Sequence, residues 1–323
     1  MASRTFREVF RHAHKETFNW FPGHMKKGMR LMQQRLRSID GIIELHDARA
    51  PLSGRNDLFR QNLSLVRPHL LLLNKKDLAD LTRQEQVVRR LKEQGVSEVF
   101  YTDCLRDQDE TVKQIMPKMV DMIKTGQRYL TPNMKASSYT LMIIGVPNVG
   151  KSSFINAVRR VFTKRAKAAH VGAMPGITRA VQNVITVSEK PRIDVIDTPG
   201  IAHPSIKSPD DAMKLALCHI MDDVLVGEEL IVDYMLFWFN RRGDFRYVEH
   251  LGLTEPVDDV RILLVQYAVQ HDLFLSVKSV EGSIGYRKIP NFLLAAQRIL
   301  KIFRSGEMGK IMLDDDKLDL YRS

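Results

Sequence analysis

One eight-residue stretch, residues 145–152, constrains the fold of this chain more than any other feature. It is Gly-Val-Pro-Asn-Val-Gly-Lys-Ser and fits the pattern G-x-x-x-x-G-K-[ST], a glycine-rich turn whose backbone amides bind phosphate. The apolar run 139–144 before it predicts a buried strand, and Phe154, Ile155 and Val158 after it recur at helical spacing. A chance glycine-rich turn is the alternative. A strand before the loop and a helix after it favour a phosphate site in an α/β fold.

The residue types in this P-loop suit a nucleoside triphosphate. Glycine lets the backbone wrap a phosphate without a Cβ in the way, and the first amides of the following helix point at the anion. Lys151 can reach the β and γ phosphates, and the Ser152 hydroxyl can complete the coordination of Mg²⁺. The nucleotide contacts predicted from this loop come from Asn148, Val149, Gly150, Lys151, Ser152 and Ser153.

A second polar motif follows the apolar run 69–73, which is typical of a strand covered on both faces. It is Asn74-Lys-Lys-Asp77, and the Asp77 carboxylate can accept hydrogen bonds from both N1 and N2 of guanine, a donor pair that adenine lacks. Asn74 and Lys75 can brace the base and the surrounding loops. By itself N-K-x-D also fits a polar helix start with Asp77 as the cap. Beside a P-loop, it predicts a guanine nucleotide site.

Two further elements after the P-loop suit nucleotide switches. The basic, small-residue segment 164–173 predicts a loop, and shortly after it Thr178 can bind Mg²⁺ and sense the γ phosphate. A strand predicted at 192–196 then leads into Asp197-Thr-Pro-Gly200, where Asp197 can hold Mg²⁺ through water and the Gly200 amide can bond the γ phosphate. Each element alone also fits an ordinary loop or turn. Their place after the P-loop, within one α/β unit, favours the switch interpretation.

The order of these motifs is unusual. In familiar small GTPases the P-loop comes first and N-K-x-D last, whereas here N-K-x-D precedes the P-loop. The same sheet is therefore threaded from a different starting point, as in a circular permutation. This order, with Trp20-Phe-Pro-Gly-His-Met25 upstream and Asp47-Ala-Arg49 after a strand predicted at 41–46, resembles the circularly permuted ribosome-assembly GTPases of the YlqF/RbgA type. Within that family, residues 20–300 are most similar to the mitochondrial ribosome-associated GTPase 1 group.

The resemblance implies a function, ligands and a location. It implies a GTPase that binds the mitochondrial large ribosomal subunit or its rRNA, promotes its assembly and mitochondrial translation, and hydrolyses GTP to GDP and phosphate on ribosome activation. The implied ligands are GTP or GDP, Mg²⁺ and K⁺. Asn148 is the implied K⁺ ligand, and the K⁺ ion supplies the positive charge that an arginine finger provides in other GTPases. The implied location is the mitochondrion, on the matrix side of the inner membrane in peripheral contact. The family's second base-contacting motif is poorly matched at Thr102-Asp-Cys104, which predicts weaker nucleotide affinity.

Catalysis in this chain needs a substitute for the usual glutamine. Many GTPases have a Gln directly after D-x-x-G to orient the attacking water, but this chain has Ile201, which cannot hydrogen-bond water. The resemblance indicates His24 as the residue that approaches the γ phosphate, and a histidine can position water. A role for His24 at a helix start or in an RNA contact is the open alternative. The predicted catalytic set is His24, Lys151, Thr178 and Gly200.

The composition favours a globular protein with a polyanionic partner. An apolar content of 44% with 27% charged residues is that of a globular chain. The net charge of +11 favours RNA as a partner beyond the nucleotide, and a merely soluble basic protein is the alternative. Cys104 and Cys218 form neither a disulfide framework nor a metal-ligand cluster. No apolar run approaches the roughly 20 residues of a membrane span.

The chain divides into three predicted parts. Residues 1–19 are an N-terminal extension whose basic, amphipathic pattern resembles a mitochondrial presequence, although Glu8 and Glu16 argue for an ordinary helix. Residues 20–204 are the circularly permuted GTPase domain with a doubly wound sheet, and residues 205–323 are a smaller, mostly helical domain that binds RNA or the ribosome. Helices are predicted there at 210–225, 228–241, 257–273 and 291–304. Candidate RNA-facing residues are Arg241, Arg242, Arg246, Lys278, Arg287, Lys288 and Arg298.

The acidic tail at residues 314–316 is predicted to be exposed. Two other functions remain open at this point. A nucleotide-gated, non-catalytic RNA-binding factor would bind GTP without ribosome-stimulated turnover. A P-loop kinase or ATPase would keep its nucleotide choice after Asp77→Asn, whereas a GTPase would lose its preference for guanine.

Overall fold

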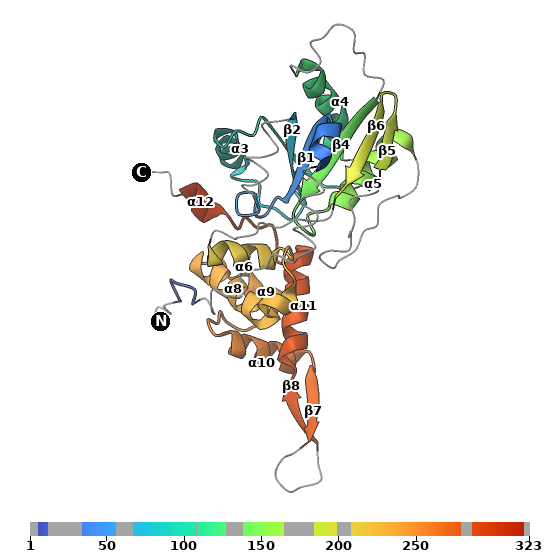
Figure 1. The fold of residues 1–323 in the computed structure, drawn as a ribbon. Coiled ribbons are helices and arrows are strands. Elements are labelled where there is room, and N and C mark those ends of the chain that lie inside the picture. The colour runs from blue at the N-terminus through green and yellow to red at the C-terminus, as the bar shows by residue number, and fades with distance from the viewer. Residues whose placement is uncertain are drawn as a thin grey trace. The chain divides into compact units, whose positions relative to one another are not determined.

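The computed structural model describes residues 6–11, 34–55, 67–106, 109–126, 138–164, 184–198, 208–278 and 286–319, and Figure 1 shows their helices and strands. The chain divides into two compact units. One unit comprises residues 19–221 and 310–323 and contains the large sheet. The other comprises residues 1–18 and 222–309 and is mostly helical.

The large sheet has six strands in the order β3-β2-β1-β4-β6-β5. The strands are β1 (Gly41–Asp47), β2 (His69–Asn74), β3 (Glu98–Thr102), β4 (Ser138–Gly145), β5 (Val184–Glu189) and β6 (Arg192–Asp197). The pairs that link β3, β2, β1, β4 and β6 are parallel, and β5 joins β6 antiparallel at one edge. Strands β1 and β2 are buried along their whole length, as the continuous apolar runs predict for parallel strands covered on both faces.

Five helices and one short 3-10 turn belong to the described part of the same unit. They are η2 (Leu36–Ser38), α3 (Gln84–Glu93), α4 (Glu110–Thr125), α5 (Lys151–Thr163), α6 (Pro209–Leu217) and α12 (Asp315–Asp319). Side chains start two of them: Asp109 accepts from the Thr111 amide at α4, and Ser208 accepts from the Asp211 amide at α6. Helix α3 packs Val87 and Leu91 into a core shared with β2.

The second unit is built around an apolar helix. Its elements are α7 (Asp223–Val226), α8 (Glu228–Arg241), α9 (Arg246–His250), α10 (Val260–Gln270), β7 (Phe274–Lys278), β8 (Tyr286–Pro290) and α11 (Phe292–Ser305). Helix α8 is buried around most of its circumference, so it forms the centre of this unit. Among the described helices, none combines the length and apolar character that crossing a membrane requires.

The N-terminal segment contributes to this helical unit. Its described part, residues 6–11, is irregular rather than helical. The ring of Phe10 packs 5.1 Å from Tyr234 and 5.5 Å from Phe237, measured between centroids. Arg7 donates to the carboxylates of Asp233 and Asp258. These contacts anchor the segment on α8 and on the loop before α10, which the charge pattern of the sequence does not predict.

Several elements differ from their sequence predictions. The helix predicted at 210–225 is two helices, α6 and α7, because the chain breaks between them with His219 in a left-handed conformation. The antiparallel pair β7 and β8 was not predicted. The sheet-containing unit also takes in α6 and residues 310–323, so the compact units do not divide at residue 204. The predicted functions of the two parts stay predictions.

The acidic tail is the clearest correction. Its first carboxylate, Asp314, is 0% exposed rather than solvated. Ser53 and the buried Lys214 lie against it. Both partners are far from residue 314 in the sequence, so the acidic composition of the tail alone could not indicate that Asp314 is buried.

Candidate nucleotide site

The P-loop, the N-K-x-D motif and Asp197 lie at the carboxyl ends of neighbouring strands, where the strand order of the large sheet reverses. From β1 the chain moves outward through β2 to β3, whereas the two strands that follow β4 in the chain, β5 and β6, lie on the other side of it. In open α/β sheets such a reversal leaves a crevice at the carboxyl ends of the two central strands, and ligands bind there. The P-loop directly follows β4, N-K-x-D begins at the end of β2, and Asp197 ends β6.

Two glycines in the P-loop occupy positions that a side chain would block. Gly145 has φ 148° and Gly150 has φ 96°. A Cβ on Gly145 would collide with the carbonyl oxygen of Leu45, and one on Gly150 would collide with the side-chain amide of Asn74. Helix α5 begins at Lys151, directly after Gly150, so its first backbone amides face the place where an anion would lie.

The ammonium group of Lys151 lies inside the loop. Its Nζ donates to the carbonyl oxygens of Gly145 at 3.1 Å and Val146 at 2.9 Å. Burial lowers the pKa of Lys151 to about 8, and the carboxylate of Asp197 opposes part of that shift. A phosphate bound in the loop would stabilise the charged form of this lysine, so the position of its ammonium group suits an anionic ligand.

Asp197 and Ser152 have the chemistry of a magnesium site. Burial raises the pKa of Asp197, while the charge of Lys151 and hydrogen bonds that include the Ser152 hydroxyl lower it. Its Oδ1 atom is buried and has no hydrogen-bond partner within the described part of the chain. A buried carboxylate oxygen without a donor, beside a hydroxyl, fits Mg²⁺, which protein sites hold with one or two such ligands together with substrate phosphates. The described residues contain no group of three or more His, Cys, Asp or Glu side chains that would hold a metal by itself.

Asn74 connects the N-K-x-D motif to the P-loop. Its Nδ2 donates to the carbonyl oxygen of Val149 at 2.8 Å. Its Oδ1 accepts from the Thr102 hydroxyl and the Cys104 amide, each at 3.2 Å. One buried side chain therefore joins the ends of β2 and β3 to the phosphate loop, and it fixes the spacing between the predicted base and phosphate sites.

The other two positions of the motif differ in their surroundings. Lys75 has a positive φ of 62°, and its Nζ lies 3.0 Å from Oδ2 of Asp47. That carboxylate is also held by two hydrogen bonds from the Arg49 guanidinium. Asp77 is exposed, and partial desolvation together with the charge of Asp103 raises its pKa. An exposed carboxylate of this kind can accept hydrogen bonds from the N1 and N2 groups of guanine, which would stabilise its charged form.

Asn148, the predicted potassium ligand, is held by a backbone contact. It has φ 58°, and its Nδ2 donates to the carbonyl oxygen of His219 at 2.7 Å. His219 lies just beyond the end of α6. A cation would bind the side-chain oxygen, since the amide nitrogen is only a donor, and the His219 contact holds the side chain through that nitrogen.

Some predicted site residues lie outside the described residues, and some site residues were missed. His24, Thr178 and Gly200 are not among the described residues, so their roles stay predictions. Asp47 and Arg49 follow a predicted strand, at the end where open α/β sheets bind ligands, and belong to the family motif, but they were not among the predicted site residues. His219 acts through its backbone carbonyl, so no residue pattern would have found it.

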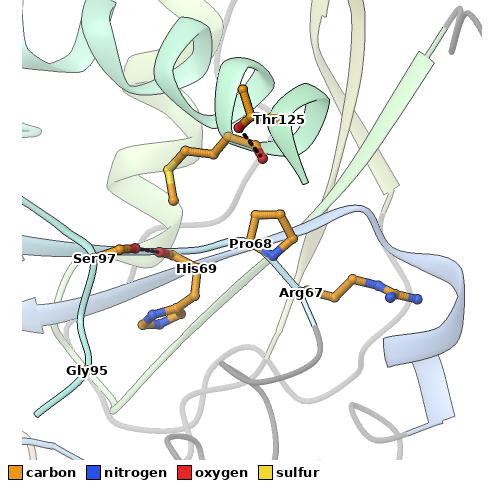
Figure 2. Close-up of a pocket in the computed structure, with 7 residues that line it drawn as sticks. Arg67, Pro68, His69, Gly95, Ser97 and Thr125 are labelled. Carbon is orange, nitrogen blue, oxygen red and sulfur yellow. Dashed lines mark hydrogen bonds between the residues drawn. The ribbon is translucent and has the colours of Figure 1, made fainter. Parts of the chain in front are cut away.

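A cavity of about 390 Å³ is separate from this site. Figure 2 shows it at the opposite end of β2, where the Ser97 hydroxyl donates to the carbonyl oxygen of His69. It is lined by Arg67, Pro68, His69, Gly95, Ser97, Met122 and Thr125. Since these residues lie at the start of the strand and the nucleotide motifs lie at strand ends, the cavity is not the nucleotide site.

Comparison with known proteins agrees with this geometry. A family described as 50S ribosome-binding GTPase matches residues 140–248. Mitochondrial ribosome-associated GTPase 1 of Ictalurus punctatus is 47% identical over 315 residues, which cover 97% of each chain. The protein of the same name from Mus musculus is 46% identical over 96% of this chain and 94% of its own.

A solved structure shares the fold. The crystal structure of GNP-bound YlqF from T. maritima has a TM-score of 0.54 and 21% identity, over 89% of this chain and 97% of that one. The predicted fold class, a circularly permuted P-loop GTPase with a mostly parallel sheet and a helical C-terminal region, is therefore confirmed. A sheet entered at its centre, with the P-loop strand fourth in the chain, is what the permuted motif order requires.

Proposed function

The chain belongs to the mitochondrial ribosome-associated GTPase 1 family of GTP hydrolases, and we propose that it acts on the mitochondrial large ribosomal subunit. It binds this subunit or its rRNA, promotes its assembly and mitochondrial translation, and hydrolyses GTP to GDP and phosphate when the subunit activates it. The observation that carries the nucleotide part is the Asn74 side chain, which ties the guanine motif to the P-loop. A P-loop kinase or ATPase no longer fits, because the family is one of GTPases.

In this proposal each motif holds one part of GTP. Asp77 accepts from the guanine base, while the P-loop amides and Lys151 bind the phosphates. Ser152 and Asp197 hold Mg²⁺, which neutralises charge on the phosphates during transfer. Thr178 and the Gly200 amide complete the γ-phosphate contacts. These assignments are supported by the buried Asp197 oxygen, which has no partner among the described residues, and by the burial of Lys151.

Activation of the attacking water depends on a partner of the chain. Ile201 offers no hydrogen bond to water, so basal hydrolysis is slow. His24 orients the water when the ribosomal subunit binds, and the Asn148 side-chain oxygen binds K⁺ near the phosphates. Support for the second role comes from the His219 contact, which holds the Asn148 side chain in place through its nitrogen.

The helical unit supplies the proposed rRNA contact through β7 and β8. These strands form a two-stranded ribbon that extends away from α10 and α11 in Figure 1. Lys278, Arg287 and Lys288 are exposed, and no described residue forms an ion pair with any of them. Tyr286 is 73% exposed on the same ribbon. Free cations beside an exposed aromatic ring suit a phosphate backbone with unstacked bases.

Two of the predicted arginines, Arg242 and Arg246, have other contacts. Arg246 bonds to the carboxylate of Asp244, and the guanidinium of Arg242 lies 4.0 Å from the centre of the Trp238 ring. An arginine already paired to a carboxylate contributes less to a polyanion site than an unpaired one. The ribbon is therefore the stronger candidate for the rRNA contact.

We place the protein in the mitochondrion, on the matrix side of the inner membrane in peripheral contact. The names of the relatives support the organelle. The membrane contact follows from the family resemblance.

The first test is GTP turnover in potassium buffer, with and without purified mitochondrial large subunits. We expect clear stimulation by the subunit, loss of that stimulation in His24→Ala, and weaker stimulation when Na⁺ replaces K⁺. GTP binding without stimulation by any large-subunit preparation would contradict the proposal. It would favour a nucleotide-gated RNA-binding factor that does not turn over.

A further inference from the structure

Residues 310–319, called the C-terminal strap below, are built into the nucleotide-binding unit. Ile311, Met312, Leu313 and Asp314 are each at most 3% exposed. Met312 belongs to the same apolar core as Val87 and Leu91 of α3 and the inner residues of β2. A segment that follows the last helix of the other unit in the chain therefore completes the core beneath the guanine motif.

The strap forms backbone hydrogen bonds to the loop that carries Asp77. The Ile311 amide donates to the carbonyl oxygen of Leu78, and the Asp80 amide donates to the carbonyl oxygen of Ile311, both at 3.1 Å. Ala79 and Ile311 thus form a parallel bridge. Leu78 directly follows Asp77, so the strap holds the backbone immediately after the guanine-binding carboxylate.

The strap also supports the residues that hold Lys75. The Leu313 amide donates to the carbonyl oxygen of Arg49 at 2.8 Å. The guanidinium of Arg49 binds Asp47, and Asp47 in turn pairs with Lys75. Lys75 and Leu78, which lie on either side of Asp77 in the sequence, are therefore both positioned through contacts with the strap.

Asp314 is the polar anchor of the strap. Its Oδ2 accepts from the amides of Leu52 at 2.7 Å and Ser53 at 2.9 Å, and its Oδ1 accepts from the Ser53 hydroxyl. Lys214 of α6 lies 3.8 Å from the same carboxylate and 2.6 Å from Asp316. Burial lowers the pKa of Lys214, but these carboxylates outweigh it and the net pKa is raised. A buried, fully bonded carboxylate of this kind specifies one position for a segment.

We propose that the C-terminal strap positions the N-K-x-D loop for guanine recognition. Its role rests on the proposed contact between Asp77 and the base. The strap would then determine how well the protein distinguishes GDP from IDP, which lacks the 2-amino group that Asp77 accepts from. Its effect on the phosphate end of the nucleotide would be smaller, because its backbone bonds go to Arg49, Leu78 and Asp80.

The experiment compares Asp314→Ala with Asp316→Ala in the full-length protein. Both changes remove a carboxylate from Lys214, but only Asp314 also accepts from the Leu52 and Ser53 amides. The readout is the ratio of the dissociation constants for IDP and GDP, measured by displacement of a fluorescent GDP analogue. Partial unfolding weakens both ligands equally, so the ratio reports positioning and not stability.

We expect the ratio to fall about tenfold in Asp314→Ala, to stay near the wild-type value in Asp316→Ala, and to recover partly in Asp314→Asn. An unchanged ratio in Asp314→Ala would overturn the strap's role. If that variant does not fold, Asp314→Asn decides between the same two outcomes. A wild-type protein that binds IDP as tightly as GDP would instead refute the guanine contact of Asp77, and Asp77→Asn supplies the reference value for a lost contact.

Discussion

The side chain of Asn74 offers the most direct test of how the nucleotide site is built. It is 3% exposed and makes three hydrogen bonds, to Val149, Thr102 and Cys104. Changing Asn74→Ala removes all three at once. The carbonyl oxygen of Val149 and the amide of Cys104 then lose the partner that Asn74 supplied.

The size of the effect follows from these two backbone groups. A buried polar group that loses its partner costs about 1–3 kcal/mol, so two of them cost about 2–6 kcal/mol in the free energy of unfolding. Water can enter from the side where the nucleotide binds and replace part of the lost bonding. We therefore expect Asn74→Ala to lower the free energy of unfolding by about 2–4 kcal/mol.

The assay is equilibrium denaturation of the full-length protein without nucleotide, followed by circular dichroism. Thr102→Val is the matched control, because it removes one of the three bonds, leaves both backbone groups paired and keeps the side-chain volume. The free energy of unfolding of Thr102→Val should fall by about 1 kcal/mol or less. If the free energy of unfolding of Asn74→Ala also falls by less than about 1 kcal/mol, the Asn74 side chain does not hold the guanine motif and the P-loop together.

Two further predictions concern binding. Because burial lowers the pKa of Lys151 to about 8 and a bound phosphate would raise it again, nucleotide binding takes up a proton in alkaline solution. GDP affinity should thus fall about fourfold between about pH 7 and pH 8.5, as measured by calorimetry, and a flat profile would contradict the lowered pKa. In the helical unit, Arg287→Ala with Lys288→Ala should weaken binding to large-subunit rRNA and reduce its salt dependence, whereas Arg246→Ala, already paired to Asp244, should change little. Equal effects from both would argue against the ribbon.

Most of the sheet could be predicted from local sequence. The strands at 41–46, 69–73 and 139–144 were predicted and are confirmed, since strands covered on both faces need continuous apolar runs. Helix α8 was predicted with its observed bounds. The pair β7 and β8 was missed because each strand has only five residues and is mostly exposed, so neither has the continuous apolar run that marks the buried strands.

The sequence by itself determined which loops meet and what chemistry they carry. The motif residues stand at the ends of apolar strands, and the carboxyl ends of parallel strands share one edge of a sheet, so the clustering of the predicted nucleotide contacts followed from spacing alone. Only the tertiary structure decided how that site is supported. Asn74 reaches Val149, the His219 carbonyl reaches Asn148, and Asp314 lies buried against Ser53. Each of these contacts joins residues far apart in the chain, and hydrogen bonds of that kind leave no local pattern to recognise.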